Sequence, residues 1–144
     1  MVNVQSRIHI DRPRTEVADF AANPDNAPQW YVNIHSSQRL TAGPLGVGSK
    51  VAFNAAFMGR ELSYTYEFVE YVPGGKLVMR TAQGPFPMET THTWQPVDGT
   101  RTRMTLRNRG EPAGFGKVAA PVMAAAMRRA NQKDLANLKR ILDN

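Results

Sequence analysis

His92 is the side chain in this sequence best placed for acid–base chemistry. It lies in a segment where apolar and polar residues alternate, in the same register as Met88 and Trp94, so it points toward a core or a cavity. There it can act as a general acid or base, or anchor a polar group of a ligand. The alternative, slightly favoured, is a half-buried histidine bound to a neighbour or to water. His9 and His35 fall on the polar side of their strands, and no ligands with metal spacing share the face of His92, so we expect no metal and no cofactor.

Aromatic side chains share the apolar registers of the predicted strands. Each one taken alone is more simply a core residue. Together they are typical of an apolar pocket into which a few polar groups point. Tyr64 and Tyr66 carry hydroxyls that need partners when buried, and these hydroxyls can donate hydrogen bonds to a developing enolate. Trp30 follows a proline turn and either caps the core or lines the mouth of the pocket. The predicted ligand-binding residues are Trp30, Phe53, Phe57, Tyr64, Tyr66, Phe86, Met88, His92, Met123 and Met127.

The long C-terminal helix has small residues where bulk is expected. Residues 118–127 read Val-Ala-Ala-Pro-Val-Met-Ala-Ala-Ala-Met. Because packed interiors do not tolerate large voids, either the sheet lies close over the alanines or a cavity stays open beneath residues 124–126. In the second case Met123 and Met127 give the cavity adaptable walls. Pro121 predicts a kink or a late start of the helix.

A simple order of elements positions these side chains. Residues 2–10 alternate as a strand, a short helix ends before Asn23, and one or two helical turns follow. Further strands are expected near residues 33–41, 51–57, 62–68, 77–81, 86–95 and 101–109, and a long helix over about 115–142. Short turns between consecutive strands predict an antiparallel sheet, and its apolar face needs the helix as a cover. We therefore expect one α+β domain over residues 1–144, a curved sheet of about seven strands around the C-terminal helix.

The alternation also predicts which side chains face inward. Even-numbered residues within 62–68, 86–94 and 102–106 should face the long helix. The odd positions of the last strand carry arginines, which should form a solvated row on the outer face without a catalytic role: Arg101, Arg103, Arg107 and Arg109.

Composition places the chain among soluble globular proteins. Its 144 residues are 42% hydrophobic and 21% charged, which excludes a disordered chain. The lack of cysteine excludes disulfides, thiolate metal sites and a thiol nucleophile. No apolar run reaches the roughly 18–20 residues of a membrane span, and the N-terminus lacks a signal-peptide core. We expect a cytoplasmic protein with no membrane insertion.

The net charge of +6 comes from the C-terminal third. Residues 1–98 carry eight basic and nine acidic side chains, whereas residues 99–144 carry ten basic and three acidic ones. Such a segment can contact nucleic acid or an acidic partner, but solvated strand and helix faces explain it more simply. The glycine-rich segment 43–50 superficially resembles a phosphate loop, yet its final pair is reversed and it leads into a strand. A nucleotide site is therefore not expected.

Several segments resemble the polyketide cyclase/dehydrase family of the START-like, helix-grip superfamily. They are the N-terminal Val-x-Val-x-x-x-Ile-x-Ile-Asp-Arg-Pro, Asn23-Pro24 with Pro28 and Trp30, Gly46-Val-Gly-Ser-Lys, the stretch from Tyr66 to Pro73, and Asp98-Gly-Thr-Arg-Thr-Arg. The resemblance spans essentially the whole chain. Its residues mark turns and the ends of helices and strands, so it is more specific for fold than for activity. It implies a deep apolar cavity between sheet and long helix that binds hydrophobic small molecules.

Two functions of different class follow from these features. The first is binding of a hydrophobic small molecule, polyketide-, aromatic- or lipid-like, without chemistry, by a monomer or homodimer. The second is an aromatase/cyclase or dehydratase acting on a polyketide-like substrate, with His92 as acid or base. Because no carboxylate is expected on the cavity face near His92 to orient it, binding is favoured. A basic surface for nucleic acid is the weakest hypothesis, since no nucleic-acid motif accompanies the arginines.

Overall fold

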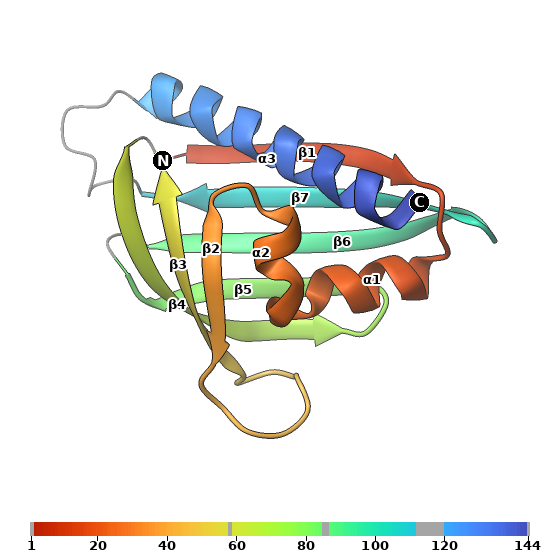
Figure 1. The fold of residues 1–144 in the computed structure, drawn as a ribbon, viewed down its shortest axis with the longest axis horizontal. Helices are drawn as coiled ribbons and strands as arrows, with labels where there is room; N and C mark the ends of the chain where they lie inside the picture. The colour runs from red at the N-terminus through yellow and green to blue at the C-terminus, as the bar shows by residue number, and fades with distance from the viewer. Residues whose placement is uncertain (1, 58, 85–86, 112–119, 144) are drawn as a thin grey trace.

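A seven-stranded antiparallel sheet forms the body of the computed structural model, which describes residues 2–57, 59–84, 87–111 and 120–143 (Figure 1). Its strands are β1 (Val2–Ile10), β2 (Ile34–Arg39), β3 (Lys50–Phe57), β4 (Arg60–Val72), β5 (Lys76–Gln83), β6 (Met88–Asp98) and β7 (Arg101–Gly110). The order across the sheet is β1-β7-β6-β5-β4-β3-β2, so consecutive strands from β2 to β7 pair as neighbours. The predicted sheet is confirmed.

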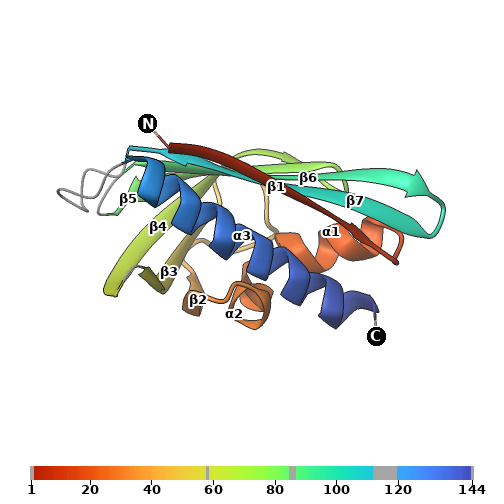
Figure 2. The same cartoon turned by 90° about the horizontal axis from the view of Figure 1, so that it is seen from above.

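The helices cover one face of this sheet. The connection from β1 to β2 contains α1 (Arg14–Ala22), the 3-10 turn η1 (Pro24–Asn26) and α2 (Ala27–Trp30), and α3 (Ala120–Asp143) ends the described chain. Figure 2 shows β2, β3 and β4 curling toward the side on which the helices lie. The predicted α+β architecture is thereby confirmed. The expected helix start at residue 115 lies outside the described residues, and Pro121 is the second residue of the described helix.

The curl of the sheet has a local cause in β4. This strand is 13 residues long, and its pairing with β5 shifts register between Thr65 and Tyr66 and again between Phe68 and Glu70. Such irregularities bend a strand and increase its twist. The bent strand carries β3 and β2 around the helices, and so encloses space between the sheet and α3.

Period-two alternation correctly predicts the inward-facing side chains. The described even-numbered positions within 62–68, 88–94 and 102–106 are buried or half-buried, including Tyr66, Met88 and Met104. Phe86 lies outside the described residues. On the opposite face, the arginines of β7 form the predicted row but have partners: Arg101 pairs with Asp98, Arg103 donates to Gln95, Arg107 donates to Asn3, and Arg109 pairs with Glu89.

The glycine-rich segment 43–50 serves as a connection between β2 and β3. The N–H of Gly48 donates to the carbonyl of Phe68 at 2.8 Å, and that of Gly46 donates to Ser49 Oγ at 3.0 Å. The segment leads directly into β3 at Lys50. The amides of Gly46 and Gly48 are therefore bonded within the protein.

Side chains and backbone far apart in sequence hold α3 in place. The N–H of Asp11 donates to Asp143 Oδ1 at 2.8 Å, and Arg12 Nε donates to the carbonyl of Leu142 at 2.6 Å. One turn earlier, Asn137 Nδ2 donates to the carbonyl of Gln29 at 3.0 Å. The C-terminal half of α3 is thus tied to the β1–α1 connection and to α2. No helix of the described chain is long and apolar enough to cross a bilayer.

Two hydrophobic clusters fill the interior. The larger one contains Trp30, Phe68, Trp94, Leu135 and Leu138 and joins α1, α2 and the end of α3 to the sheet. The smaller one consists of Val2, Val4, Leu62, Met88, Met123 and Met127 beneath the first turns of α3. Side chains of both clusters line a space between them, and that space contains the candidate site.

Candidate ligand-binding site

A cavity of about 140 Å³ lies between the curled sheet and the middle of α3. Empty apolar cavities of about this size admit a molecule such as benzene. Its apolar wall is formed by Ile34, Phe53, Ala55, Ala56, Phe57, Leu62, Met79, Met88, Met127 and Ala130. Its polar lining comes from Tyr31, Asn33, Tyr64, Tyr66, Thr90, Asn108, Asn131 and Asp134. The cavity thus has the composition of a small-molecule site, apolar with a few convergent polar groups.

A chain of polar side chains crosses the cavity from the sheet to α3. Tyr66 and Thr90 both line the cavity, and the hydroxyl of Thr90 donates to Asn108 Oδ1 at 2.6 Å. Asn108 Nδ2 in turn donates to Asn131 Oδ1 at 2.9 Å. Asn131 is 3% exposed, and within the described part of the chain its Nδ2 has no hydrogen-bond partner. A buried donor without an acceptor costs about 1–3 kcal/mol, so this amide is suited to an acceptor atom that enters the cavity.

Tyr31 and His92 form a second polar pair beside the cavity. The Tyr31 hydroxyl and His92 Nε2 are hydrogen-bonded at 2.7 Å, and Tyr31 lines the cavity whereas His92 lies behind it. His92 is 1% exposed, and burial lowers its pKa to about 4, so the ring is neutral near pH 7. Burial and the carboxyl of Asp134 raise the pKa of Tyr31 well above its ordinary value. His92 can therefore act on a ligand only through Tyr31.

Asp134 places a carboxyl group in the cavity wall. Its Oδ1 accepts a hydrogen bond from the Val32 N–H at 2.8 Å, and the residue is 4% exposed. Burial raises its pKa to about 7, and the Val32 hydrogen bond opposes that rise. The expectation that no carboxylate lies on the cavity face near His92 is wrong, because Asp134 lies close enough to influence Tyr31, the hydrogen-bond partner of His92.

The predicted site residues fall into three groups. Phe53, Phe57, Tyr64, Tyr66, Met88 and Met127 line the cavity. Trp30, His92 and Met123 are buried next to it and do not line it. Phe86 lies outside the described residues. Contact with a ligand stays a prediction for all of them.

The alanines expected over the cavity lie one turn away from it. Ala124 packs against the smaller cluster, Ala125 is exposed, and Ala126 lines a hollow outside the cavity. The helix instead faces the cavity with Met127, Ala130, Asn131 and Asp134. At Ala124 the sheet lies close over the helix, which is the first of the two alternatives left open by the sequence, and the cavity lies beneath later residues of α3.

Sequence reasoning missed six polar residues of the cavity lining: Asn33, Thr90, Tyr31, Asn108, Asn131 and Asp134. The last two break an otherwise apolar helical stripe that runs from Met127 to Leu138 at spacings of three and four residues. That interruption is a usable signal, since buried polar groups in a helix stripe need partners or a ligand. Asn108 gives no such signal, because it follows the last apolar residue of its strand.

Similarity to solved structures shows which fold this protein has. A START superfamily protein from Mycobacterium smegmatis superposes with a TM-score of 0.84 at 12% identity, covering 98% of this chain and 97% of its own. The Zhui aromatase/cyclase from a Streptomyces species gives a TM-score of 0.81 at 16% identity, with 98% and 93% covered. The protein TTHA0849 from Thermus thermophilus gives 0.81 at 20% identity, with 96% and 94% covered. These likenesses show a START-like, helix-grip fold.

The family is shown by the sequence itself. A family model described as polyketide cyclase/dehydrase and lipid transport matches residues 1–143. The chain belongs to this family, as the sequence segments predicted. No curated protein matches the chain in a sequence search.

Proposed function

We propose that this protein binds a small, largely apolar molecule that carries one hydrogen-bond acceptor, in the cavity between the sheet and α3. The observation that carries the proposal is the buried Nδ2 of Asn131, which has no hydrogen-bond partner among the described residues and belongs to a largely apolar cavity. An acceptor oxygen on the ligand would satisfy this donor, while the ring or chain of the ligand fills the space between the clusters. The family membership supports the same coarse role.

A matched pair of ligands tests the acceptor. Acetophenone and α-methylstyrene share a planar phenyl skeleton and differ in a carbonyl oxygen against a methylene group. Their dissociation constants are measured by calorimetry for the parent protein, for Asn131→Leu and for the control Gln132→Leu. A neutral hydrogen bond contributes about 0.5–1.5 kcal/mol, so Asn131→Leu should weaken acetophenone relative to α-methylstyrene by roughly two- to tenfold.

The control residue Gln132 is exposed on the same helix, so its replacement should leave the ratio unchanged. If neither compound binds the parent protein, the binding proposal fails. If both bind and Asn131→Leu leaves their ratio unchanged, the acceptor assignment fails and apolar binding remains.

A second candidate, an enzyme that moves a proton, is favoured by Asp134. Burial holds the pKa of this cavity carboxyl at about 7, where a group can both take and give a proton. Its carboxylate could remove a proton from the carbon next to a ketone. The electron pair of that C–H bond would pass to the ketone oxygen, which Asn131 Nδ2 would stabilise as an enolate.

Deuterium exchange tests the second candidate without knowledge of the natural substrate. In deuterated buffer the protein should speed incorporation of deuterium into the methyl group of acetophenone, read by mass spectrometry. Asp134→Asn should abolish the acceleration, whereas Asp19→Asn, at an exposed position of α1, should not. Exchange at the buffer rate with the parent protein would contradict proton transfer and leave the binding proposal intact.

A further inference from the structure

A second hollow lies directly outside the cavity. It is lined by Val32 and Asn33 after α2, by Phe57 at the end of β3, and by residues of α3. Asn33, Phe57 and Ala130 line both the hollow and the cavity. Because these three residues have a face on each space, the hollow adjoins the cavity and lies where a ligand would extend toward solvent.

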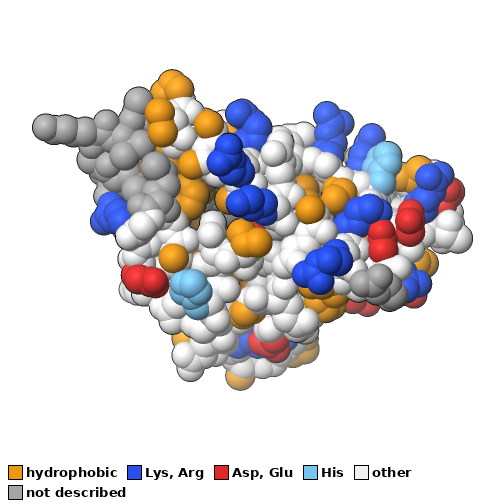
Figure 3. Space-filling view, turned by 45° about the horizontal axis from the view of Figure 1, so that its top comes forward, with side chains coloured by type: hydrophobic (Ala, Val, Ile, Leu, Met, Phe, Trp, Pro, Cys, Tyr) orange, Lys and Arg blue, Asp and Glu red, His pale blue; other side chains and the backbone are white. Residues whose placement is uncertain are grey.

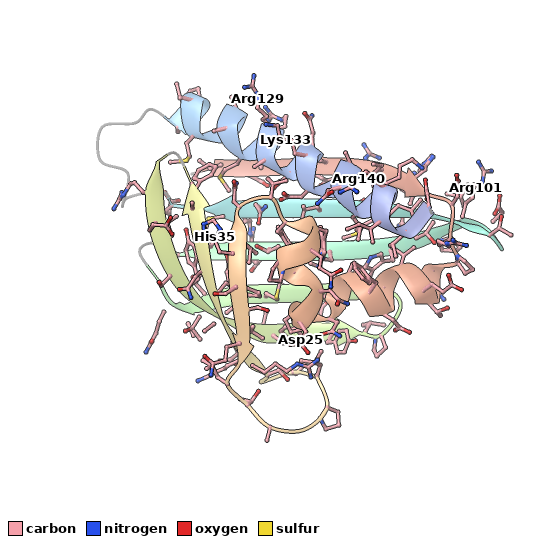
Figure 4. All side chains as sticks on the ribbon, in the orientation of Figure 1. Asp25, His35, Arg101, Arg129, Lys133 and Arg140 are labelled. Carbon is pink, nitrogen blue, oxygen red and sulfur yellow. The ribbon has the colours of Figure 1, made fainter. Side chains whose placement is uncertain are left out.

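Two basic side chains of α3 line this hollow. Arg129 and Lys133 are four residues apart on successive helical turns and are exposed (Figure 4). Like charges at this spacing repel each other on a helix. No aspartate or glutamate is among the described residues that line the hollow, and the carboxyl of Asp134 belongs to the cavity and binds the Val32 N–H.

Among the described residues, this pair lacks the side-chain partners that the arginines of β7 and Lys139 have. The arginines of β7 each bind an acidic or amide side chain, and Lys139 binds Asp143. Within the described ranges, neither Arg129 nor Lys133 has an ion pair or a side-chain hydrogen bond. Figure 3 shows basic side chains gathered along the face that carries α3, with hydrophobic side chains among them. Arg129 and Lys133 therefore give the hollow a positively charged rim beside the apolar interior of the cavity.

From this arrangement we propose that the natural ligand is a carboxylate. The part of the ligand in the cavity is apolar apart from the acceptor that faces Asn131, and a carboxylate at the other end of the ligand lies between Arg129 and Lys133. An anion there would offset the repulsion between the two cations and bind both at once, and the walls shared through Phe57 and Ala130 give its apolar part a continuous path inward. This inference rests on the proposed binding function and adds the charge and the orientation of the ligand.

Three ligands with one skeleton test the charge. 4-Phenylbutyrate, 4-phenylbutan-1-ol and 4-phenylbutylamine differ in an anionic, neutral or cationic head group. Calorimetry at low salt should give the order carboxylate, alcohol, amine, with the carboxylate about tenfold tighter than the alcohol. About 0.5 M salt should remove most of that difference, because exposed charges are screened.

Variants assign the preference to the rim. Arg129→Gln with Lys133→Gln should bring the carboxylate to the affinity of the alcohol while the alcohol itself binds unchanged. Arg128→Gln is the matched control, because Arg128 is an exposed neighbour on α3 that does not line the hollow. Unchanged melting temperatures will show that these exposed substitutions leave the fold intact.

The outcomes distinguish a failure of the carboxylate inference from a failure of the proposed binding function. If the alcohol binds as tightly as the carboxylate, or the double variant keeps the preference, the carboxylate inference is overturned and cavity binding stands. If Arg128→Gln abolishes the preference as fully as the double variant does, the effect is general helix charge and the rim assignment is overturned. If none of the three compounds binds, both proposals fail.

Discussion

His92 and Asp134 are buried groups whose protonation has opposite effects on stability. Burial lowers the pKa of His92 from 6.5 to about 4, so stability is lost as pH falls through this window, where the unfolded state binds the proton more readily. Burial raises the pKa of Asp134 from 3.8 to about 7, so stability is lost as pH rises through that window. Between about pH 4 and 6.5 the two effects oppose each other, and we expect the parent protein to show a weak pH dependence there.

Removing Asp134 should uncover the effect of His92. Asp134→Asn keeps an oxygen for the Val32 N–H but no longer titrates. The free energy of unfolding of this variant should fall by up to about 3 kcal/mol between about pH 6.5 and 4, because one pKa unit corresponds to about 1.4 kcal/mol. Urea denaturation across this range measures it. A variant whose stability changes with pH no more steeply than the parent would contradict the burial assigned to His92.

For single residues, the sequence predicted the direction of side chains correctly in the strands, where inward and outward positions alternate. His92 and Tyr66 face inward as predicted, because in a strand the register alone decides the face. Asp134 and Asn131 were missed because their orientation depends on how α3 is rotated against the sheet. That rotation is fixed by contacts such as Val32 with Asp134, which join residues 102 positions apart.

The helix α3 combines a packed part and an open part. Its first turns press Met123, which has no exposed surface, into the smaller cluster, while its middle turns face the cavity with Met127 and Ala130. The same element therefore contributes stability at one end and leaves space for a ligand in the middle. Substitutions in the packed part should mainly change stability, whereas substitutions in the open part should mainly change ligand binding.

Met123→Ala should destabilise the protein strongly. The substitution leaves a void in a packed cluster, and such changes cost about 2–5 kcal/mol. Val122→Ala is the control, because Val122 is 56% exposed on the same turn and should change stability little. Thermal and urea unfolding of the two variants give the comparison. A loss of under about 1 kcal/mol at Met123 would show that the cluster is not packed as described.

Ala130→Leu should fill the cavity. In a packed core the added bulk costs about 1–3 kcal/mol, but beside an open space it should leave the melting temperature unchanged or higher and should weaken acetophenone binding. Ala136→Leu, at an exposed position one and a half turns on, should affect neither property. Clear destabilisation by Ala130→Leu with unchanged ligand affinity would place the open space elsewhere.

In the whole molecule, the arginine row of β7 and the cavity lie on opposite faces of the sheet. The arginine row of β7 lies on the outer face and is bound to neighbouring side chains, and Arg101 lies at the hairpin end far from α3's first turns (Figure 4). The two rim cations instead lie on the helix side, next to the apolar interior. The basic residues of β7 and those that line the hollow thus lie on different faces of the molecule.

The fold as a whole could be predicted from the sequence far better than the site. The antiparallel pairing of consecutive strands, the inward faces and the covering helix follow from alternation and short turns, which are local features, whereas the place of β1 beside β7 does not. The cavity depends on the bend of β4 and on the place where α3 crosses it. Both arise from contacts between distant segments, such as Arg12 with Leu142, and a single sequence does not record them.

The most direct test of cavity binding uses the methionine methyl groups. Met79, Met88 and Met127 line the cavity from β5, β6 and α3, whereas Met104 is fully buried in the larger cluster away from it. With methyl-labelled methionine, titration of acetophenone should shift the resonances of the first three, show contacts from the phenyl protons to their methyl groups, and leave Met104 in place. If all three resonances stay fixed at saturating ligand, or Met104 alone responds, the molecule does not bind ligands in this cavity.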